Sequence, residues 1–234
     1  EVNGEKYLVV GGEDHKTGHE ENTEKCFLNL EAYVRKYFDV EEVKYKWSSQ
    51  YYESADGLPY IGHYPLHPGQ NIWVATGYGG NGMIYSTLSA IILRDMIVAG
   101  KSEYEKLFDP NRIKPIAGFK EFVSNAAEAI TNFVKKPFNA EKIEELADLA
   151  HGEGKIVKYD GEKIALYKDE QGAYHVISST CNHMGCSIAW NSAEKSWDCP
   201  CHGSRYTPDG EMITGPAMKD QAQAEIGQNA YQQA

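Results

Sequence analysis

The residues Cys-Asn-His-Met-Gly-Cys at 181–186 and Cys-Pro-Cys-His-Gly-Ser at 199–204 carry the strongest signal in this chain. Fifteen residues separate His183 from Cys199, so each of two short segments supplies both cysteine and histidine. Clustered cysteines form disulfides, bind metal or do both, and thiolate with imidazole suits zinc or an iron–sulfur cluster. Zinc fingers keep cysteines in one arm and histidines in the other. Four cysteines with two histidines also exceed the four ligands of zinc, so two thiols need another role.

The residues around these motifs have the period of two that is typical of β-strands. Residues 155–159 and 162–168 are joined by Asp160-Gly161, which is a strong hairpin signal. A further strand is expected over 173–178, and Asp209-Gly210 marks another hairpin. The last third of the chain is therefore predicted to be a small antiparallel β domain whose loops carry the cysteines.

Together the two motifs resemble the cluster-binding loops of Rieske [2Fe–2S] proteins, over residues 143 to about 220. The resemblance implies that two cysteines hold one iron and two histidines hold the other. The implied metal ligands are Cys181, His183, Cys199 and His202. The resemblance also implies a disulfide between Cys186 and Cys201, as in the Rieske proteins of respiratory and photosynthetic complexes. A β module stapled by zinc or disulfides, without a redox role, is the alternative.

The same resemblance implies a reduction potential in the upper part of the Rieske range. Neutral imidazoles replace two anionic thiolates, and Rieske potentials run from about −150 to +300 mV, against about −400 mV for plant-type ferredoxins. Hydrogen bonds to the sulfur atoms raise the potential further. Ser204 and Tyr206 stand where hydroxyl groups donate to a bridging sulfide and to a cysteine sulfur, respectively. Pro216 lies in a segment that resembles the proline loop covering the cluster.

A glycine-rich motif, Gly-Tyr-Gly-Gly-Asn-Gly at 77–82, follows a predicted strand over 72–75 and opens a predicted helix over 83–99. Its G-x-G-x-x-G pattern is that of dinucleotide-binding Rossmann folds. A Rossmann unit continues into a second buried parallel strand, and residues 101–110 do not have that character. The mononucleotide-binding interpretation is therefore rejected.

Residues 54–62, 72–77 and 107–112, with this glycine loop, resemble the C-terminal part of D-amino-acid-oxidase-like flavoproteins. In that group the loop and the N-terminus of the next helix approach the flavin, where the helix dipole stabilises negative charge. The residues implied to contact FAD are Asp56, Gly57, Pro59, Gly79, Gly80, Asn81, Gly82 and Met83. The half that grips the ADP of FAD has no counterpart in this chain. We expect it to precede these residues in a longer protein and to be their partner.

We therefore expect an α+β chain in three parts. Residues 1–112 are the C-terminal part of a D-amino-acid-oxidase-like FAD oxidoreductase α/β domain. Residues 113–142 are a helical connector, in which apolar residues fall three and four positions apart. Residues 143–234 are the all-β, antiparallel Rieske domain.

Local patterns add detail to the first part. Short strands are expected at 6–10 and 43–52, which are rich in β-forming residues. Apolar residues recur at helical spacing from Thr23 to Tyr37 and predict an amphipathic helix. Cys26 lies on the apolar face of that helix and is interpreted as a small buried hydrophobic residue.

Composition narrows the function. The chain has 34 acidic and 23 basic side chains and a formal charge of −11, so nucleic-acid binding is disfavoured because phosphates are repelled. The longest apolar run, 83–99, contains Arg94 and Asp95, and we expect it to be too short and too charged to span a bilayer. The first residues lack the apolar core of a secretory signal, so a cytoplasmic location is expected.

These resemblances imply an FAD-dependent oxidoreductase that oxidises a C–N bond and passes electrons singly through a Rieske cluster to an unknown acceptor. The full-length protein would then be the enzyme, and this chain its C-terminal portion. The alternative is a stand-alone Rieske electron carrier whose first half serves only for docking.

Overall fold

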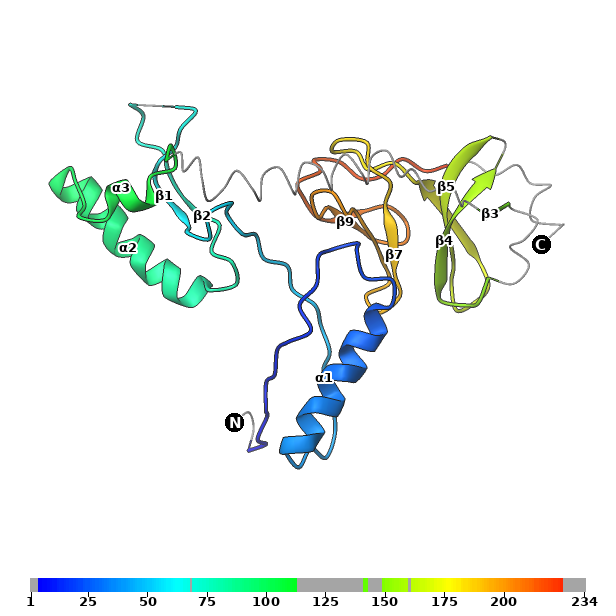
Figure 1. Cartoon of the computed structure of the whole chain (residues 1–234). Helices are drawn as coiled ribbons and strands as arrows, with labels where there is room; N and C mark the ends of the chain where they lie inside the picture. Colours follow the sequence, from blue (N-terminus) through cyan, green and yellow to red (C-terminus); the bar gives the residue numbers. More distant parts are fainter. Residues whose placement is uncertain (1–3, 68, 113–140, 143–148, 160, 225–234) are drawn as a thin grey trace. The chain divides into compact units, whose positions relative to one another are not determined.

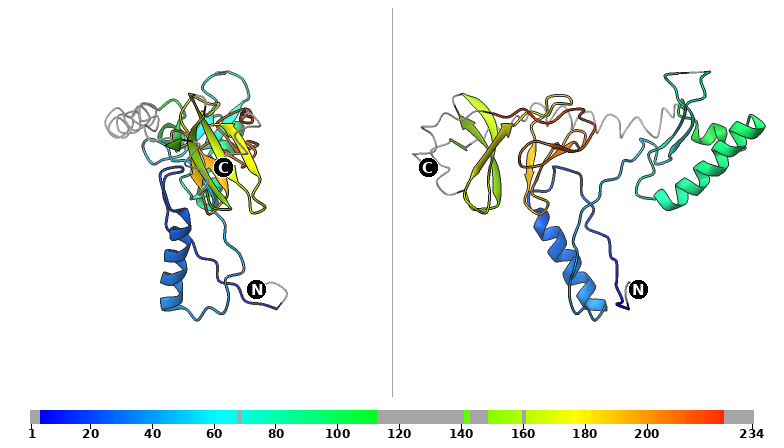
Figure 2. Two further views of the ribbon diagram at one scale, coloured as in Figure 1. Left: turned by 90° about the vertical axis from the view of Figure 1, so that its right-hand side faces the viewer. Right: turned by 180° about the vertical axis from the view of Figure 1, so that it is seen from behind.

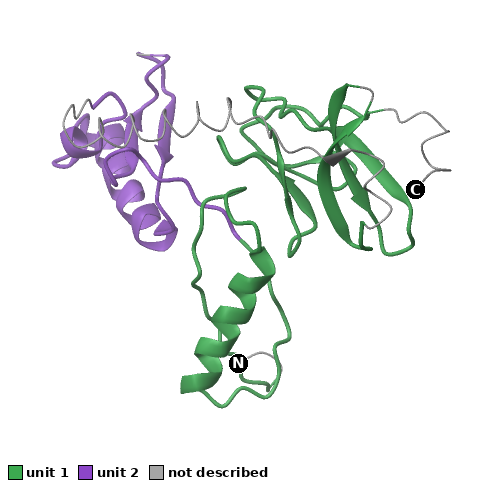
Figure 3. Cartoon of the chain, turned by 45° about the vertical axis from the view of Figure 1, so that its right-hand side comes forward, with its two compact units in different colours: residues 1–48, 128–234 green, residues 49–127 purple. Residues whose placement is uncertain are grey.

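The computed structural model describes residues 4–67, 69–112, 141–142, 149–159 and 161–224. The chain divides into two compact units, one of residues 1–48 with 128–234 and one of residues 49–127, as Figure 3 shows. This division differs from the predicted boundary at residue 112, because residues 1–48 group with the β domain. Nearly all of the predicted connector, 113–142, lies outside the described residues.

The unit of residues 49–127 contains a two-stranded antiparallel sheet of β1 (Tyr60–His63) and β2 (Trp73–Thr76). Helix α2 (Gly82–Ala99) follows the glycine loop, and the short α3 (Glu105–Phe108) comes after it. Figure 1 labels these elements in green and cyan. Their shared core consists of Ile61, Ile92, Met96 and Phe108. Gly100 ends α2 in the left-handed conformation, with φ of 74°, which confirms the predicted helix end.

Among the described residues, α2 is the one helix that is long and apolar enough to cross a membrane by length and composition. The expectation that this stretch is too short and too charged is therefore wrong on that criterion. Most of the helix is not buried in this unit. A single helix of this kind is weak evidence for a membrane span, because core helices of soluble proteins have the same composition.

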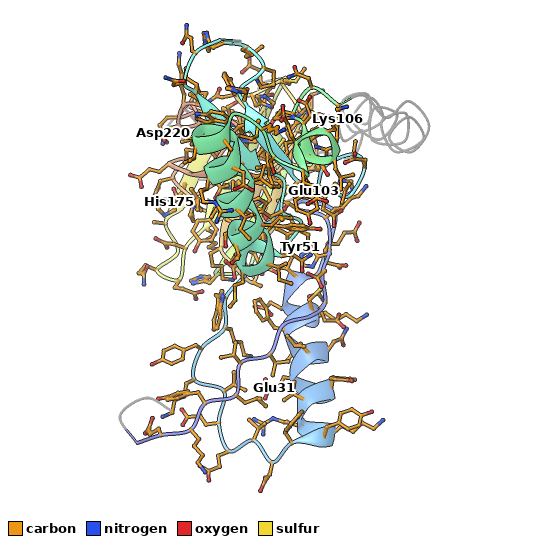
Figure 4. The ribbon with its side chains drawn as sticks, turned by 90° about the vertical axis from the view of Figure 1, so that its left-hand side faces the viewer. Glu31, Tyr51, Glu103, Lys106, His175 and Asp220 are labelled. Carbon is orange, nitrogen blue, oxygen red and sulfur yellow. A yellow bond between two sulfur atoms is a disulfide. The ribbon has the colours of Figure 1, made fainter. Side chains whose placement is uncertain are left out.

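Helix α1 (Thr23–Tyr37) forms where the apolar periodicity predicts it. The Asn22 side chain caps its N-terminus by accepting a hydrogen bond from the backbone N–H of Lys25 at 3.0 Å. Glu31, labelled on this helix in Figure 4, pairs with Arg35 at 2.9 Å and with Lys46 at 3.4 Å. Strands are also expected at 6–10 and 43–52, but no strand is assigned in either of these described segments.

The β domain contains two four-stranded sheets (Figure 1, Figure 2). The first has the order β3-β4-β5-β6 and the second the order β10-β9-β8-β7. Their bounds are β3 Glu141–Lys142, β4 Glu153–Tyr159, β5 Glu162–Lys168, β6 Tyr174–Ser178, β7 Ala189–Asn191, β8 Ser196–Asp198, β9 Arg205–Tyr206 and β10 Met212–Thr214. Pairing is antiparallel except between β3 and β4. The prediction of a small, essentially antiparallel all-β domain is confirmed.

One core cluster of this domain surrounds the two cysteine loops. Trp197 and Tyr206 are its largest fully buried side chains, and Cys181 and Cys199 belong to it. Gly154 on β4 lies against Trp190, because a Cβ at this position would come within 2.5 Å of the indole ring. The cysteine loops therefore emerge from a closely packed aromatic base.

His175 on β6 is labelled in Figure 4. It contacts carboxylates from two loops that do not carry the cysteines. Its Nδ1 lies 2.6 Å from an Asp209 carboxylate oxygen, and its Nε2 lies 3.3 Å from Asp169. Burial alone lowers the pKa of His175, but the two carboxylates outweigh burial and raise the pKa above its ordinary value. The charged imidazole therefore stabilises the folded state.

We expect His175→Gln to lower the free energy of unfolding by about 1 kcal/mol near pH 6. The folded pKa of His175 is raised, so its contribution is complete below the unfolded pKa and disappears as the pH rises through the folded value. Urea unfolding followed by tryptophan fluorescence at about pH 6 and about pH 9 measures the difference. His151→Gln, at an exposed histidine, is the control. An equal deficit at both pH values would contradict the prediction.

Candidate metal centre

The two cysteine loops share one backbone hydrogen-bond pattern. In each loop the first cysteine donates to the carbonyl five residues later, and a glycine donates to the carbonyl of that cysteine. The bonds are Cys181 N to Cys186 O at 2.8 Å, Gly185 N to Cys181 O at 3.0 Å, Cys199 N to Ser204 O at 2.8 Å and Gly203 N to Cys199 O at 2.9 Å. The glycines at 185 and 203 have φ of 76° and 80°, which other residues rarely adopt. Each loop therefore turns tightly and presents its cysteine in the same way.

The two loop cysteines outside the disulfide, Cys181 and Cys199, lie within hydrogen-bonding reach of each other. Cys181 is 2% exposed and Cys199 is 1% exposed. The Tyr206 hydroxyl lies 3.2 Å from the Cys181 sulfur. A hydrogen bond from the Cys199 thiol, with a second from Tyr206, lowers the pKa of Cys181 to about 5. Cys181 and burial together raise the pKa of Cys199, so the pocket stabilises one negative charge, on the Cys181 sulfur, and keeps Cys199 as the thiol that donates to it.

Two imidazoles, one from each cysteine loop, lie edge to face. The rings of His183 and His202 have centroids 4.7 Å apart and are nearly perpendicular, at 88°. Burial lowers the pKa of His202, and the nearby His183 lowers it further, so the His202 ring is kept neutral. The Nδ1 atom of His202 is buried and has no hydrogen-bond partner among the described residues. A neutral imidazole with an unpartnered buried nitrogen fits a metal ligand.

A disulfide between Cys186 and Cys201 joins the two loops, with an S–S distance of 2.02 Å. The predicted pairing is confirmed. The sulfur atoms of Cys186, Cys199 and Cys201 all lie within 4.8 Å of one another. Because two of them form the disulfide, Cys199 is the member of this group that is left for a metal. The disulfide thus provides the further role that the two additional thiols require.

Two further predicted residues lie against the loops. Ser204 is fully buried, and its Oγ accepts a hydrogen bond at 3.0 Å from the backbone N–H of Ala217. This leaves the Ser204 hydroxyl hydrogen available to another acceptor. Pro216, next to Ala217, follows a cis peptide bond and is exposed. The segment that carries Pro216 is therefore anchored to the second cysteine loop through Ser204.

Comparison with known proteins agrees with this geometry. Residues 139–226 match the family model of the Rieske [2Fe-2S] domain, and residues 3–96 match that of the FAD dependent oxidoreductase. The chain joins part of an FAD-dependent oxidoreductase to a Rieske domain. The Rieske domain indicates a [2Fe–2S] cluster that transfers electrons, and the other family implies FAD.

Relatives include YhfW of Bacillus subtilis (strain 168), which is named as a Rieske 2Fe-2S iron-sulfur protein. It is 34% identical over 226 residues, which cover 96% of this chain and 44% of YhfW. The cytochrome b6-f complex iron-sulfur subunit of Chlorobaculum tepidum is 37% identical over 70 residues, or 30% of this chain and 38% of that subunit. This chain therefore spans less than half the length of these two relatives.

Among solved structures, the plasma membrane Rieske protein PetC3 from Synechocystis PCC 6803 is 25% identical. The alignment covers 31% of this chain and 74% of that protein, with a TM-score of 0.29.

The Rieske domain also contains a buried polar network that sequence reasoning missed. An Asp198 carboxylate oxygen accepts hydrogen bonds from Arg205 at 3.0 Å and from Ser196 at 2.8 Å. The other oxygen accepts from the Asn191 amide at 2.9 Å. Asp198 directly precedes Cys199, so the network supports the second cluster-binding loop. The polar residue types resemble those of an exposed hairpin, and their burial is visible only when β7, β8 and β9 are paired.

In the FAD-oxidoreductase region, the glycine loop and residues 53–57 line a pocket of about 330 Å³. Four of the residues predicted to contact FAD lie in its lining. They are Asp56, Gly57, Gly79 and Asn81. Pro59 is fully buried, whereas Met83 is 91% exposed. The structure therefore brings together two of the predicted segments but does not place every predicted residue in the pocket.

The Asp56 carboxylate is engaged by Arg112. Two guanidinium nitrogens of Arg112 lie 2.8 Å and 2.7 Å from its two oxygens. The side chains are only 6% and 7% exposed. Arg112 also donates to the carbonyl oxygens of Leu58 and Pro59 and stacks on Tyr60, 4.1 Å from the ring centroid. Asp56 therefore holds the pocket loop in place through Arg112, a role that its sequence position did not indicate.

Proposed function

We propose that this chain carries electrons through a [2Fe–2S] cluster as the C-terminal part of an FAD-dependent oxidoreductase that oxidises C–N bonds. One observation supports it most directly. Two buried thiols, an orphaned imidazole nitrogen and a disulfide between the loops occur in a chain that also matches an FAD-dependent oxidoreductase.

The proposed ligands are the thiolates of Cys181 and Cys199 and a ring nitrogen each from His183 and His202. A bound Rieske cluster supplies reversible one-electron chemistry. The residues around it have separate tasks. The Tyr206 hydroxyl donates toward Cys181 sulfur, and the aromatic core excludes water from the thiol side. The His183 ring is exposed to solvent and is a natural exit for the electron.

The flavin is proposed to lie against the pocket beside the glycine loop. The positive φ values of Gly79 (54°) and Gly80 (80°) allow the backbone to turn there without a side chain. Helix α2 begins next to this pocket, and its N-terminus favours negative charge. The half that binds the ADP moiety is proposed to come from the remainder of the same protein. The C–N bond as the site of oxidation follows from the flavoprotein resemblance.

The test uses the full-length protein, purified without added reductant. An amine substrate that reduces the flavin should also produce the electron paramagnetic resonance signal of a reduced Rieske cluster. Iron and acid-labile sulfide should be present in equal amounts, two of each per chain. Zinc in place of iron would overturn the electron-transfer assignment. Flavin reduction that never reduces the cluster would overturn the coupling of the two groups.

Tyr206→Phe should lower the midpoint potential of the cluster by about 60 mV, which corresponds to about 1.4 kcal/mol for one electron. The substitution removes the hydroxyl that lies 3.2 Å from Cys181 sulfur and stabilises negative charge there. Redox titration monitored by circular dichroism gives the shift. Tyr174→Phe, on β6, is the control and should leave the potential unchanged. An unaltered potential in Tyr206→Phe would show that the hydroxyl does not act on the cluster.

A further inference from the structure

Residues 18–23, which precede and begin α1, lie directly against the second cluster-binding loop. Both belong to the unit of residues 1–48 and 128–234, coloured green in Figure 3. The Nε2 atom of His19 donates to the carbonyl oxygen of Pro200, with a distance of 3.0 Å. Pro200 lies between Cys199 and Cys201. A residue from the FAD-oxidoreductase match thus bonds to the backbone between a proposed cluster ligand and a disulfide cysteine.

Gly18 makes this approach possible. Its φ is 72°, and a Cβ built on it would lie 2.9 Å from Pro200 N and 3.1 Å from Asp198 O. Any side chain at this position would therefore collide with the backbone on both sides of Cys199. The two stretches of backbone are in contact because residue 18 is glycine.

Thr23 makes the second attachment, at the hairpin between β7 and β8. It is 6% exposed, and its hydroxyl donates to the Asn191 side-chain oxygen at 2.7 Å, across 168 positions of sequence. The same Thr23 oxygen accepts from the backbone N–H of Ala193 at 3.1 Å. Asn191 in turn donates to Asp198, which precedes Cys199. Thr23 is therefore continuous with the polar network that supports the second loop.

A third attachment lies beyond α1. The backbone N–H of Ser48 donates to the Glu194 carboxylate at 3.0 Å, and the other Glu194 oxygen lies 3.6 Å from Arg205. Contacts from both ends of the 18–48 segment thus reach the same hairpin. Of these contacts, the Thr23–Asn191 hydrogen bond is buried, so it is costly to separate because each group would be left without a partner.

We propose that residues 18–23 form a docking element that attaches the FAD-oxidoreductase region to the second cluster-binding loop. The partner surface is Pro200 together with the hairpin residues Asn191 and Ala193. This proposal rests on the proposed function, since the loop to which residues 18–23 bind is one of the two that would hold the cluster. The docking element links the two matched regions at the loop that carries the proposed ligands Cys199 and His202.

The test is amide hydrogen exchange, measured by mass spectrometry on the intact chain. Thr23→Val keeps the shape of the side chain but leaves the N–H of Ala193 without its acceptor. Exchange should become about tenfold faster in peptides covering 189–204 as well as in those covering 17–24. Thr23→Ser restores the hydroxyl and should return both regions to the wild-type rate.

Two further variants keep the proposal falsifiable if one substitution disturbs folding. His19→Ala and Gly18→Ala should each speed exchange in 189–204, whereas the matched controls His15→Ala and Gly11→Ala should not. His15 bonds through Nδ1 to the Glu13 carbonyl in its own loop, and among the described residues nothing lies within 4 Å of a Cβ at Gly11. Wild-type exchange across 189–204 in all three docking variants would overturn the docking element. A wild-type protein that gives no Rieske signal would instead overturn the proposed function. The exchange rates would still test the docking element in that case.

Discussion

Cys199→Ser should abolish the iron–sulfur cluster, so that purified protein contains neither iron nor acid-labile sulfide and gives no Rieske resonance signal. A serine hydroxyl is a poor substitute for a thiolate that ligates iron. Cys199 is 1% exposed and is left for the metal when Cys186 and Cys201 pair with each other. His202→Ala should have the same result, because it removes the buried Nδ1 that has no other partner among the described residues.

The matched control for the cysteine variant is Cys26→Ser on α1. Cys26 is a free, partly buried thiol, and burial raises its pKa, so it is the thiol form that is present there. This variant should retain full iron and sulfide content. A Cys199→Ser protein that keeps a normal cluster would contradict the ligand set. Loss of the cluster in Cys26→Ser as well would show that the effect is one of general instability.

Arg112→Met should destabilise the unit of residues 49–127 by about 3–5 kcal/mol, because it leaves the Asp56 carboxylate buried without its partner. The guanidinium binds both oxygens of Asp56, and both side chains are almost inaccessible to water. Arg112 also satisfies two backbone carbonyls of the loop that lines the pocket. We therefore expect FAD binding by the full-length protein to weaken with the loss of loop order.

A double-mutant cycle separates the ion pair from simple packing. Asp56→Asn in the Arg112→Met background should recover part of the lost stability, since the uncompensated charge is then gone. Arg94→Met is the control, because the Arg94–Asp95 pair is exposed and should contribute less than about 1 kcal/mol. The measurement is urea unfolding of the intact chain. Equal losses from Arg112→Met with and without Asp56→Asn would argue against a charge effect.

Much of the Rieske domain could be predicted because its signals are local. The Asp160-Gly161 turn signal lies between two alternating segments of the sequence, and β4 and β5 pair as expected. The spacing of Cys, His and Gly in the two short motifs at 181–186 and 199–204 is specific enough to indicate a metal centre. The structure adds a common hydrogen-bond pattern that makes the two loops geometric equivalents.

The expected strands at 6–10 and 43–52 show where local signals are insufficient. Their residues favour extended backbone, but a strand requires a neighbour to satisfy its N–H and C=O groups. Among the described residues, no strand pairs with either segment. Side chains such as Val9 and Trp47 are correspondingly exposed, at 74% and 61%.

The amino-acid sequence alone determined the metal-binding residue types, the hairpins and the helix ends, because each depends on residues only a few positions apart. The tertiary structure decided which groups meet across long separations. It paired Asp56 with Arg112 and placed Thr23 against Asn191. When distant segments pack, they bury polar groups, and each buried group then needs a hydrogen-bonding partner from another segment. No short-range pattern in the sequence indicates which partner that is.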